Sequence, residues 1–422
     1  MGKRLLFAVL TIAFGAFAGA FAWAFFFLMN SGIGLLWDTV PNLLASAGVP
    51  TLPFPLVVCM AGGLAIGLFA KRFGPYPQTM NEVMAQVKKT GRYEYDKLGP
   101  SFFGALLPLL FGGSIGPEAG LTGVIAGLCT WVGDRLRFAG TEMRELAQAG
   151  TAAVITAIFA TPLFGLAVPA AGVADGSEGP RTASEMRLDV PKPLKAAVYI
   201  LAAAGALGAM MLLGSLFGHG GGLPRFTDMA LGLPELLWAL PCALVGAAAG
   251  WLYFPLGAAA RRLAAALGER PVAKAVVAGA ILGACGTVLP FTLFAGEAQT
   301  EVLAGAWTAL GAGVLVATGF LKVLATQFCL NLGWRGGHFF PLIFAGIAIG
   351  YGLAVLTGVD SVFALCTVTG ALLGAVMRQP VMTALLLFLV FPVKGAIVLL
   401  AAAALGSLLP VPARWREPRA ER

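Results

Sequence analysis

Charged residues are scarce in this chain of 422 residues: they make up 11% of it, against 59% hydrophobic residues. The mean hydropathy is +0.87. Soluble domains have about 25% charged residues, so this composition excludes an ordinary soluble protein and indicates one that crosses a membrane several times. The formal charge of +8 comes mainly from short loops and tails, so it gives no reason to expect a nucleic-acid partner.

Cysteine pairs and histidine clusters are also missing. The 6 cysteines lie one by one in apolar segments, and the 2 histidines are His219 and His338. Metal and redox centres need several ligands or thiols at short spacing, so we predict neither, and no cofactor. No nucleotide-binding loop occurs, which argues against transport driven by ATP hydrolysis within this chain.

Long apolar runs fill most of the sequence. A membrane span needs about 20 apolar residues, and the candidate segments are residues 5–28, 53–70, 102–133, 145–174, 194–217, 233–259, 272–295, 303–333, 339–357 and 362–409. Several are too long for one crossing or contain Gly and Pro, so we predict roughly ten to eighteen helices, some broken or tilted. We expect a single transmembrane domain over residues 1–422, with approximate halves 30–260 and 261–411 and no soluble regulatory domain.

Basic residues flank the apolar runs near both ends of the chain, at Lys3, Arg4, Arg414, Arg416, Arg419 and Arg422. Because cytoplasmic loops carry an excess of Lys and Arg, we predict a multi-pass protein of a bacterial inner membrane with both termini in the cytoplasm. The first apolar run lacks an obvious cleavage site, so it is interpreted as a membrane helix and not as a signal peptide.

Two glycine-rich breaks interrupt the apolar segments, one in each half. Residues 112–118 read Gly-Gly-Ser-Ile-Gly-Pro-Glu, and residues 336–341 read Gly-Gly-His-Phe-Phe-Pro. Glycine lets the backbone leave helical geometry and proline is tolerated at the first helical position, so each break predicts an unwound strip that leads into a helix N-terminus. The free amides and positive dipole end of such a helix attract anions. We therefore predict one anion site where the two helix ends meet.

Similar motifs accompany both breaks in the same order. A Gln-Thr pair and then a lone lysine precede each break, and a proline-containing motif follows it: residues 78–79, Lys97 and residues 160–163 in the first half, and residues 299–300, Lys322 and residues 378–381 in the second. The shared order indicates a duplication. Repeats with broken helices at mid-membrane are typical of transporters, in which opposed half-helices build the substrate site.

These motifs resemble the CLC family of chloride channels and proton-coupled anion transporters. The first break resembles its Gly-x-x-Gly-Pro signature at Gly113, Ser114, Ile115, Gly116 and Pro117, and the second its Gly-x-Phe-x-Pro signature at Gly337, His338, Phe339, Phe340 and Pro341. The resemblance spans most of residues 60–400. It implies an all-α fold of two inverted repeats, a homodimer with one anion pathway per subunit, and an anion held by backbone amides of residues 338–340, Ser114 and Gly116.

Several residues depart from the family pattern. Proton-coupled members have a glutamate between the glycines of the first signature, where this chain has Ile115, and their inner relay glutamate has no counterpart in residues 168–172. No tyrosine follows Tyr351, and the serine-bearing signature is reduced to a segment in which Gly74 and Pro75 are candidate pathway residues. The loss of titrating side chains favours a passive channel or uniporter for chloride, with fluoride, nitrate and bicarbonate as other candidate anions.

Glu118 keeps a second hypothesis open. In the simpler interpretation, this carboxylate sits in the first turn of a helix and is stabilised by the dipole of that helix. In the other, Glu118 is a gate that competes with anions for the helix end and leaves when protonated, which would make the protein a proton-coupled antiporter. Ile115 is the second candidate gate, by its position in the signature.

The remaining candidates each have two interpretations. Lys97 and Lys322 either add positive potential to the pathway or extend their ammonium groups to the membrane interface. His338 either holds its loop by packing or titrates in the pore. A remote alternative is an intramembrane enzyme acting on a lipid, but the chain lacks convergent acids and a nucleophile–base pair, so we predict no catalytic residue. A non-conducting structural or sensory protein is a third possibility.

Overall fold

The fold is known from a computed structural model, which describes residues 2–50, 53–79, 82–83, 86, 93–136, 153, 192–218, 225–388 and 390–415. Within these ranges every element is a helix, and the sole extended pairing is an isolated bridge between Gly116 and Gly337. In this described part, 7 helices are long and apolar enough to cross a membrane. The predicted all-α membrane protein is therefore confirmed.

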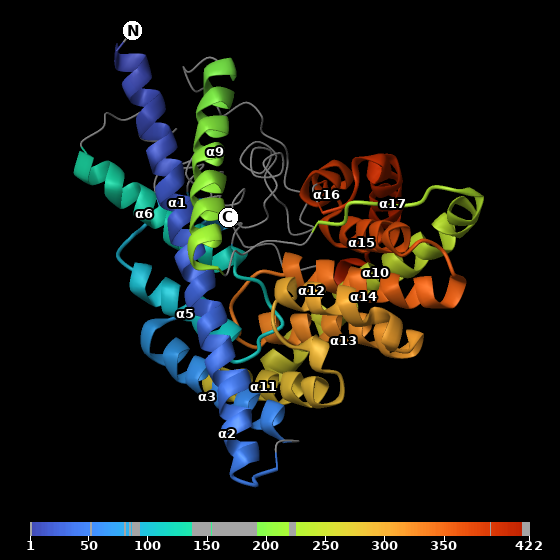
Figure 1. Cartoon of the computed structure of the whole chain (residues 1–422). Coiled ribbons are helices and arrows are strands. Elements are labelled where there is room, and N and C mark those ends of the chain that lie inside the picture. Colours follow the sequence, from blue (N-terminus) through green and yellow to red (C-terminus); the bar gives the residue numbers. More distant parts are fainter. Residues whose placement is uncertain are drawn as a thin grey trace.

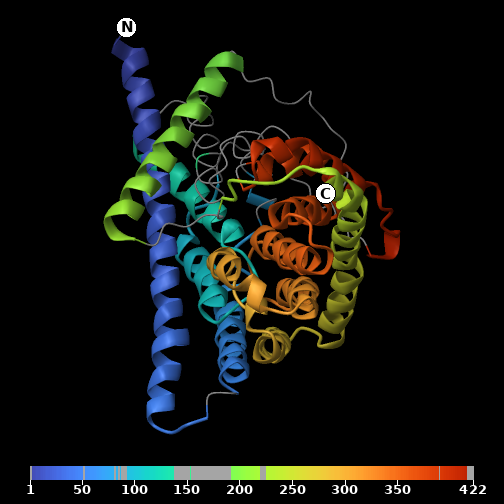
Figure 2. The same cartoon turned by 45° about the vertical axis from the view of Figure 1, so that its right-hand side comes forward.

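A long N-terminal rod forms one edge of the molecule (Figure 1). Helix α1 (Gly2–Gly34) continues through a π-helical turn, η1 (Leu35–Thr39), into α2 (Val40–Ser46). Helix α9 (Lys192–Phe217) packs along α1, and Figures 1 and 2 both show the two side by side. Gly15 and Gly19 of α1 lie directly against the backbone of α9, because small residues let membrane helices approach closely.

The rest of the described chain forms a bundle of helices. Its α-helices are α3 (Phe54–Phe73), α5 (Leu98–Leu110), α6 (Glu118–Leu136), α10 (Leu233–Ala266), α11 (Pro271–Val288), α12 (Glu297–Ala306), α13 (Ala312–Asn331), α14 (Phe339–Thr357), α15 (Ser361–Met377), α16 (Pro380–Leu387) and α17 (Ala396–Leu408). Single 3-10 turns are η2 (Pro290–Thr292), η3 (Trp307–Ala309), η4 (Val393–Gly395) and η5 (Ala413–Trp415).

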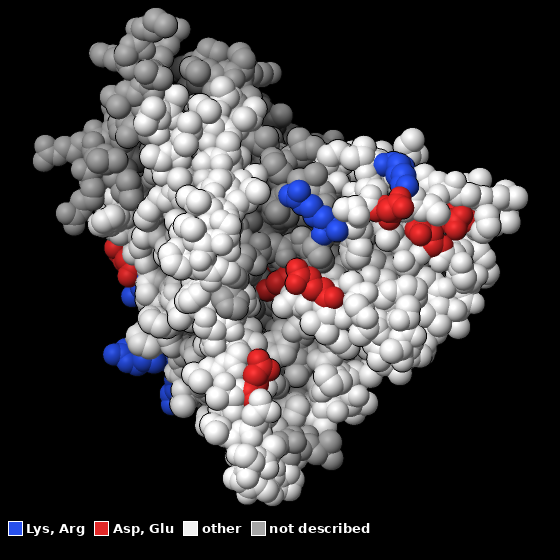
Figure 3. Space-filling model, in the orientation of Figure 1, with Lys and Arg blue, Asp and Glu red and all other residues white. Residues whose placement is uncertain are grey.

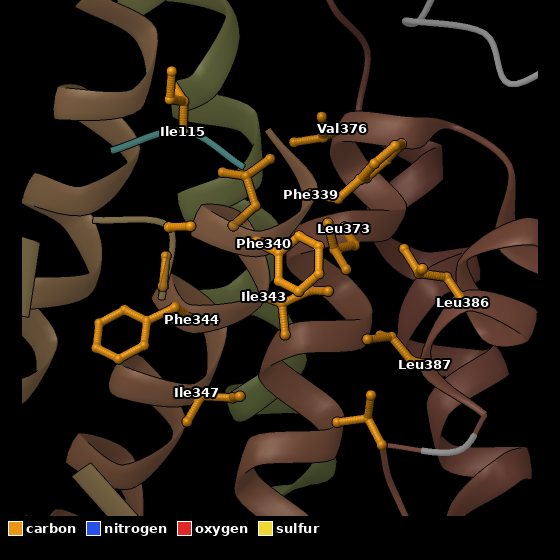
Figure 4. Close-up of a cluster of buried hydrophobic side chains, with 14 of the residues drawn as sticks. Ile115, Phe339, Phe340, Ile343, Phe344, Ile347, Leu373, Val376, Leu386 and Leu387 are labelled. Atoms are coloured by element: carbon orange, nitrogen blue, oxygen red, sulfur yellow. The ribbon is translucent and has the colours of Figure 1, made fainter. Parts of the chain in front are cut away.

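Helix α14 lies at the centre of the bundle (Figure 2). It is apolar on all sides and buried along most of its length, as a helix without a polar face must be. Its neighbours are α13 and α15. Figure 4 shows Phe340 and Ile343 of α14 beside Leu373 of α15, with Leu386 and Leu387 of α16 farther along the same apolar cluster. This packing holds the N-terminus of α14 in the interior.

Uncharged side chains cover most of the described surface seen in Figure 3. Large apolar side chains are exposed on several helices, for example Leu212 on α9 at 59% and Ile397 on α17 at 83%. In water such side chains would favour association, whereas a bilayer solvates them. The surface therefore agrees with the membrane prediction.

The glycine-rich breaks divide the apolar runs as predicted. Residues 102–133, which are too long for one crossing, form α5, a break and α6. Gly112 has a φ of +84°, which side chains other than glycine rarely adopt. Residues 362–409 also divide, into α15, α16 and α17, although neither break lies within them. The candidate segment 145–174, and the motifs at 160–163 and 168–172, lie outside the described residues apart from Ala153.

Close backbone contact holds α3 against α11. A Cβ atom on Gly279 would collide with the Cys59 carbonyl, and one on Gly63 with the Ala275 carbonyl. We expect Gly279→Ala to lower the free energy of unfolding by about 1–3 kcal/mol, because the helices must move apart. Thermal unfolding of the purified protein in detergent measures the loss. Gly208→Ala is the control, because Gly208 of α9 has open space around it, and equal losses in both variants would contradict the prediction.

Candidate functional site

The two breaks meet in the interior of the molecule. The amide of Gly116 donates a hydrogen bond to the carbonyl of Gly337, and the amide of Gly337 donates to the carbonyl of Gly116, each at 2.8 Å. Residues 112–120 are all buried. The breaks therefore converge on one place, as the anion-site hypothesis requires.

Several of the amides predicted to face an anion are engaged in this conformation. The amide of Gly116 donates to the carbonyl of Gly337, and the amide of Ser114 interacts with the thiol of Cys329. The hydroxyl groups of Ser114 and Thr326 share a hydrogen bond of 3.1 Å. That the Ser114 and Gly116 amides face an anion therefore stays a prediction, and in this conformation the N-terminus of α14 is the part of the candidate site to consider next.

Glu118 occupies that helix end. Its Oε1 accepts a hydrogen bond of 2.8 Å from the amide of Phe339, and the Phe340 amide also interacts with the carboxylate. Phe339 and Phe340 are the first two residues of α14, whereas Glu118 begins α6. The carboxylate thus caps a helix from the other half of the chain as well as lying in the first turn of its own. An anion at the predicted site would need the same amides.

The glycines of both breaks make room for this contact. A Cβ atom on Gly116 or on Gly337 would overlap the carboxyl group of Glu118, so a side chain at either position would displace it. Glu118 is 1% exposed, and its Oε2 has no hydrogen-bond partner among the described residues. A buried carboxylate oxygen without a partner is unfavourable. The α14 end therefore holds Glu118 through one oxygen only.

Ile115, the other candidate gate, has a different environment. Its side chain is fully buried and fills the space over Gly336, where a Cβ atom would collide with it. Ile115 of the first break thus packs against the second break, and Pro117 directly precedes the first residue of α6. The sequence comparison assigned the glutamate position of proton-coupled members to Ile115, but in the structure Glu118 supplies the carboxylate at the α14 end.

Lys322 lies in the interior and not at a membrane interface. Its Nζ donates to the carbonyls of Leu293 and Phe294 at 2.6 Å each, and to those of Thr292 at 3.2 Å and Phe291 at 3.4 Å. The side chain is 0% exposed, so the hypothesis that Lys322 reaches the interface is wrong. An effect of its charge on the pathway stays a prediction.

Glu297 connects Lys322 electrostatically to the anion site. This residue, 8% exposed at the start of α12, attracts Lys322 and repels Glu118. Its Oε2 has no hydrogen-bond partner within the described residues. No sequence pattern gave Glu297 a role, since the two charged residues that it interacts with lie on other helices, Glu118 on α6 and Lys322 on α13. The signal in the sequence was an acidic residue directly after a glycine within an apolar segment.

The other candidates have different surroundings. Lys97 is exposed at the residue before α5, away from the buried breaks. Gly74 and Pro75 follow α3, and Pro75 lines a cavity of about 380 Å³. His338 directly precedes α14, and its ring centroid lies 5.6 Å from that of Tyr253 and 4.6 Å from that of Phe339. These contacts support the packing interpretation of this side chain.

A sequence model for a family described as voltage gated chloride channel matches residues 62–410. The chain belongs to this chloride channel family. Curated relatives from several bacteria carry the name YfeO and are described as candidate ion-transport proteins. That of Salmonella paratyphi A is 29% identical over 359 residues, which cover 81% of this chain and 78% of the relative. That of Escherichia fergusonii is 30% identical over 358 residues, which cover 81% and 77%.

Solved structures of chloride channel family members share the fold. A slow cyanobacterial Cl⁻/H⁺ antiporter superposes with a TM-score of 0.76 at 16% identity, covering 95% of this chain and 94% of that one. A CLC-type fluoride/proton antiporter gives 0.68 at 17% identity, covering 97% and 96%. The predicted CLC-like fold is confirmed. Family members are ion channels and transporters, so an enzyme acting on lipids loses its support.

Proposed function

We propose that this protein carries a small inorganic anion across a bacterial inner membrane, and that Glu118 gates the pathway by protonation. The proposal depends on one observation, the hydrogen bond from the Phe339 amide to the Glu118 carboxylate. A helix end that holds a carboxylate offers the same amides and dipole to a free anion of the same charge. Chloride is the first anion to test, with fluoride, nitrate and bicarbonate as the others.

The gate follows from competition for the α14 end. An ionised Glu118 occupies the amides and excludes an anion. A neutral Glu118 loses the attraction of the helix dipole, so its side chain leaves and an anion takes its place. The amides replace only part of the anion's hydration shell, so binding is weak enough for the anion to leave again. We also propose a homodimer in which each subunit has its own pathway.

Passive flow through this gate is the first candidate mechanism. It is supported by the sequence, since residues 168–172 hold no carboxylate and no tyrosine follows Tyr351. Exchange of the anion for a proton is the second candidate. Glu297 favours it, because this buried carboxylate interacts electrostatically with Glu118 and would be a second place for a proton.

Flux measurements in vesicles distinguish passive flow from exchange. Purified protein is reconstituted into vesicles loaded with chloride, and efflux is followed with and without a proton ionophore. Under passive flow the reversal potential depends on the chloride gradient alone, whereas under exchange a pH gradient shifts it. The proposal fails if chloride, fluoride, nitrate and bicarbonate all remain in the vesicles at both neutral and acidic pH.

A further inference from the structure

A cavity of about 380 Å³ lies beside the two breaks. Its walls come from α3, α5, α11 and the end of α13, together with two loops: Pro75 and Tyr76 after α3, and Gly333 and Arg335 before α14. Arg335 stands two residues before Gly337, which bonds to Gly116 in the bridge. The cavity is therefore next to the candidate anion site without including the α14 end.

Two basic residues stand in the otherwise mostly apolar lining of this cavity. Lys274 and Arg335 line it together with one acid, Glu269. Within the described residues, no salt bridge joins either cation to an acid. Glu82 attracts Arg335 from outside the lining, but one of its oxygens accepts a hydrogen bond of 2.7 Å from the Thr79 amide. The donors of Arg335 and Lys274 thus remain available to an anion.

The size and the donors suit a polyatomic anion. A water molecule takes about 30 Å³ of liquid, so the cavity has room for an anion of several atoms with part of its hydration shell. A guanidinium presents parallel N–H groups that match two oxygens of a planar oxyanion, and a spherical halide cannot use both in this way. Gly333, with a φ of +99° and no atom within 4 Å of a built Cβ, leaves the space in front of this loop open.

We propose that this cavity is a second anion site that prefers planar oxyanions, of the nitrate and bicarbonate class, over chloride, and that Arg335 sets the preference. The proposal rests on the proposed function in one respect: an anion held here would be the one that next reaches the α14 end. Lys274 adds charge that attracts either kind of anion, whereas the guanidinium of Arg335 distinguishes them by geometry.

Isothermal titration calorimetry of the full chain in detergent at neutral pH tests the preference, with sodium nitrate and sodium chloride as titrants. We expect nitrate to bind about tenfold more tightly than chloride, the effect of one additional charge-assisted hydrogen bond. Arg335→Lys keeps the charge but lacks the paired donors. Nitrate should then bind about as tightly as chloride, while the affinity for chloride is unchanged. Lys274→Gln should weaken the binding of both anions.

Two controls keep the test decisive. Arg262→Gln removes an exposed cation outside the cavity and should change neither affinity, and the unfolding temperature of Arg335→Lys should match the wild type. Equal affinities in the wild type, or a nitrate preference that survives Arg335→Lys, would overturn the proposal. Chloride efflux from vesicles separates the two proposals: a wild type that prefers nitrate but carries no anion contradicts the transport function alone, and one that carries chloride without the preference contradicts the cavity site alone.

Discussion

Replacement of Glu118 by glutamine is expected to raise anion flux at neutral pH and to remove its dependence on pH. Glutamine has nearly the shape of the protonated acid but no charge to hold it on the Phe339 amide. Wild-type flux should instead rise as the pH falls, by up to about tenfold for each pH unit while a single carboxyl group titrates. Chloride efflux from vesicles over a range of pH measures both curves.

A matched substitution distinguishes this effect from a general loss of charge. Glu301 is an exposed carboxylate on α12, the same helix as Glu297, and Glu301→Gln should leave the pH dependence intact. If wild-type flux is independent of pH and Glu118→Gln leaves it unchanged, Glu118 is not a gate. In that case its contact with α14 stabilises the fold only.

Replacement of Lys322 by methionine is expected to destabilise the protein severely. The side chain is fully buried and donates to four consecutive carbonyls, Phe291 to Phe294, while its charge offsets that of Glu297. Methionine leaves the four carbonyls without this donor and the charge of Glu297 without its nearby cation, and removing a buried charge that compensates another costs about 3–5 kcal/mol. Thermal unfolding and size-exclusion profiles in detergent measure the loss.

A second substitution tests whether Glu297 is the partner that is left uncompensated. If it is, Lys322→Met combined with Glu297→Gln should lose less stability than the sum of the two single changes. Lys97→Met is the control, since Lys97 is exposed, and should change the unfolding temperature little. A Lys322→Met protein as stable as the wild type would contradict the structural role of this ion.

The membrane class and the broken helices could be predicted because both depend on local composition. Apolar runs of sufficient length and the glycines of 112–118 and 336–341 are visible in any window of the chain, and they fix where a helix can continue and where it must stop. The convergence of the breaks was also predictable in outline, from the matching motifs of the two halves. These expectations are confirmed by the helices and by the bridge between Gly116 and Gly337.

The roles of single side chains were less predictable. Ser114 and Gly116 were predicted to offer amides to an anion, but both amides have partners inside the protein. Lys322 had two interpretations. The position of its ammonium group among backbone carbonyls excludes the one in which it reaches the membrane interface. In each case the interaction partner lies in another helix or loop, far away in the sequence, so no local sequence pattern could predict the contact.

By itself, the amino-acid sequence determined that this protein is helical, lies in a membrane, and has two places where helices begin in its interior, because hydrophobicity and backbone freedom are properties of neighbouring residues. Only the tertiary structure decided which groups meet there. Glu118 lies 221 residues from Phe339 in the sequence. Whether its carboxylate interacts only with the N-terminus of α6 or also caps α14 depends on how the two helices are placed relative to each other. That arrangement comes from the packing of the whole bundle around α14.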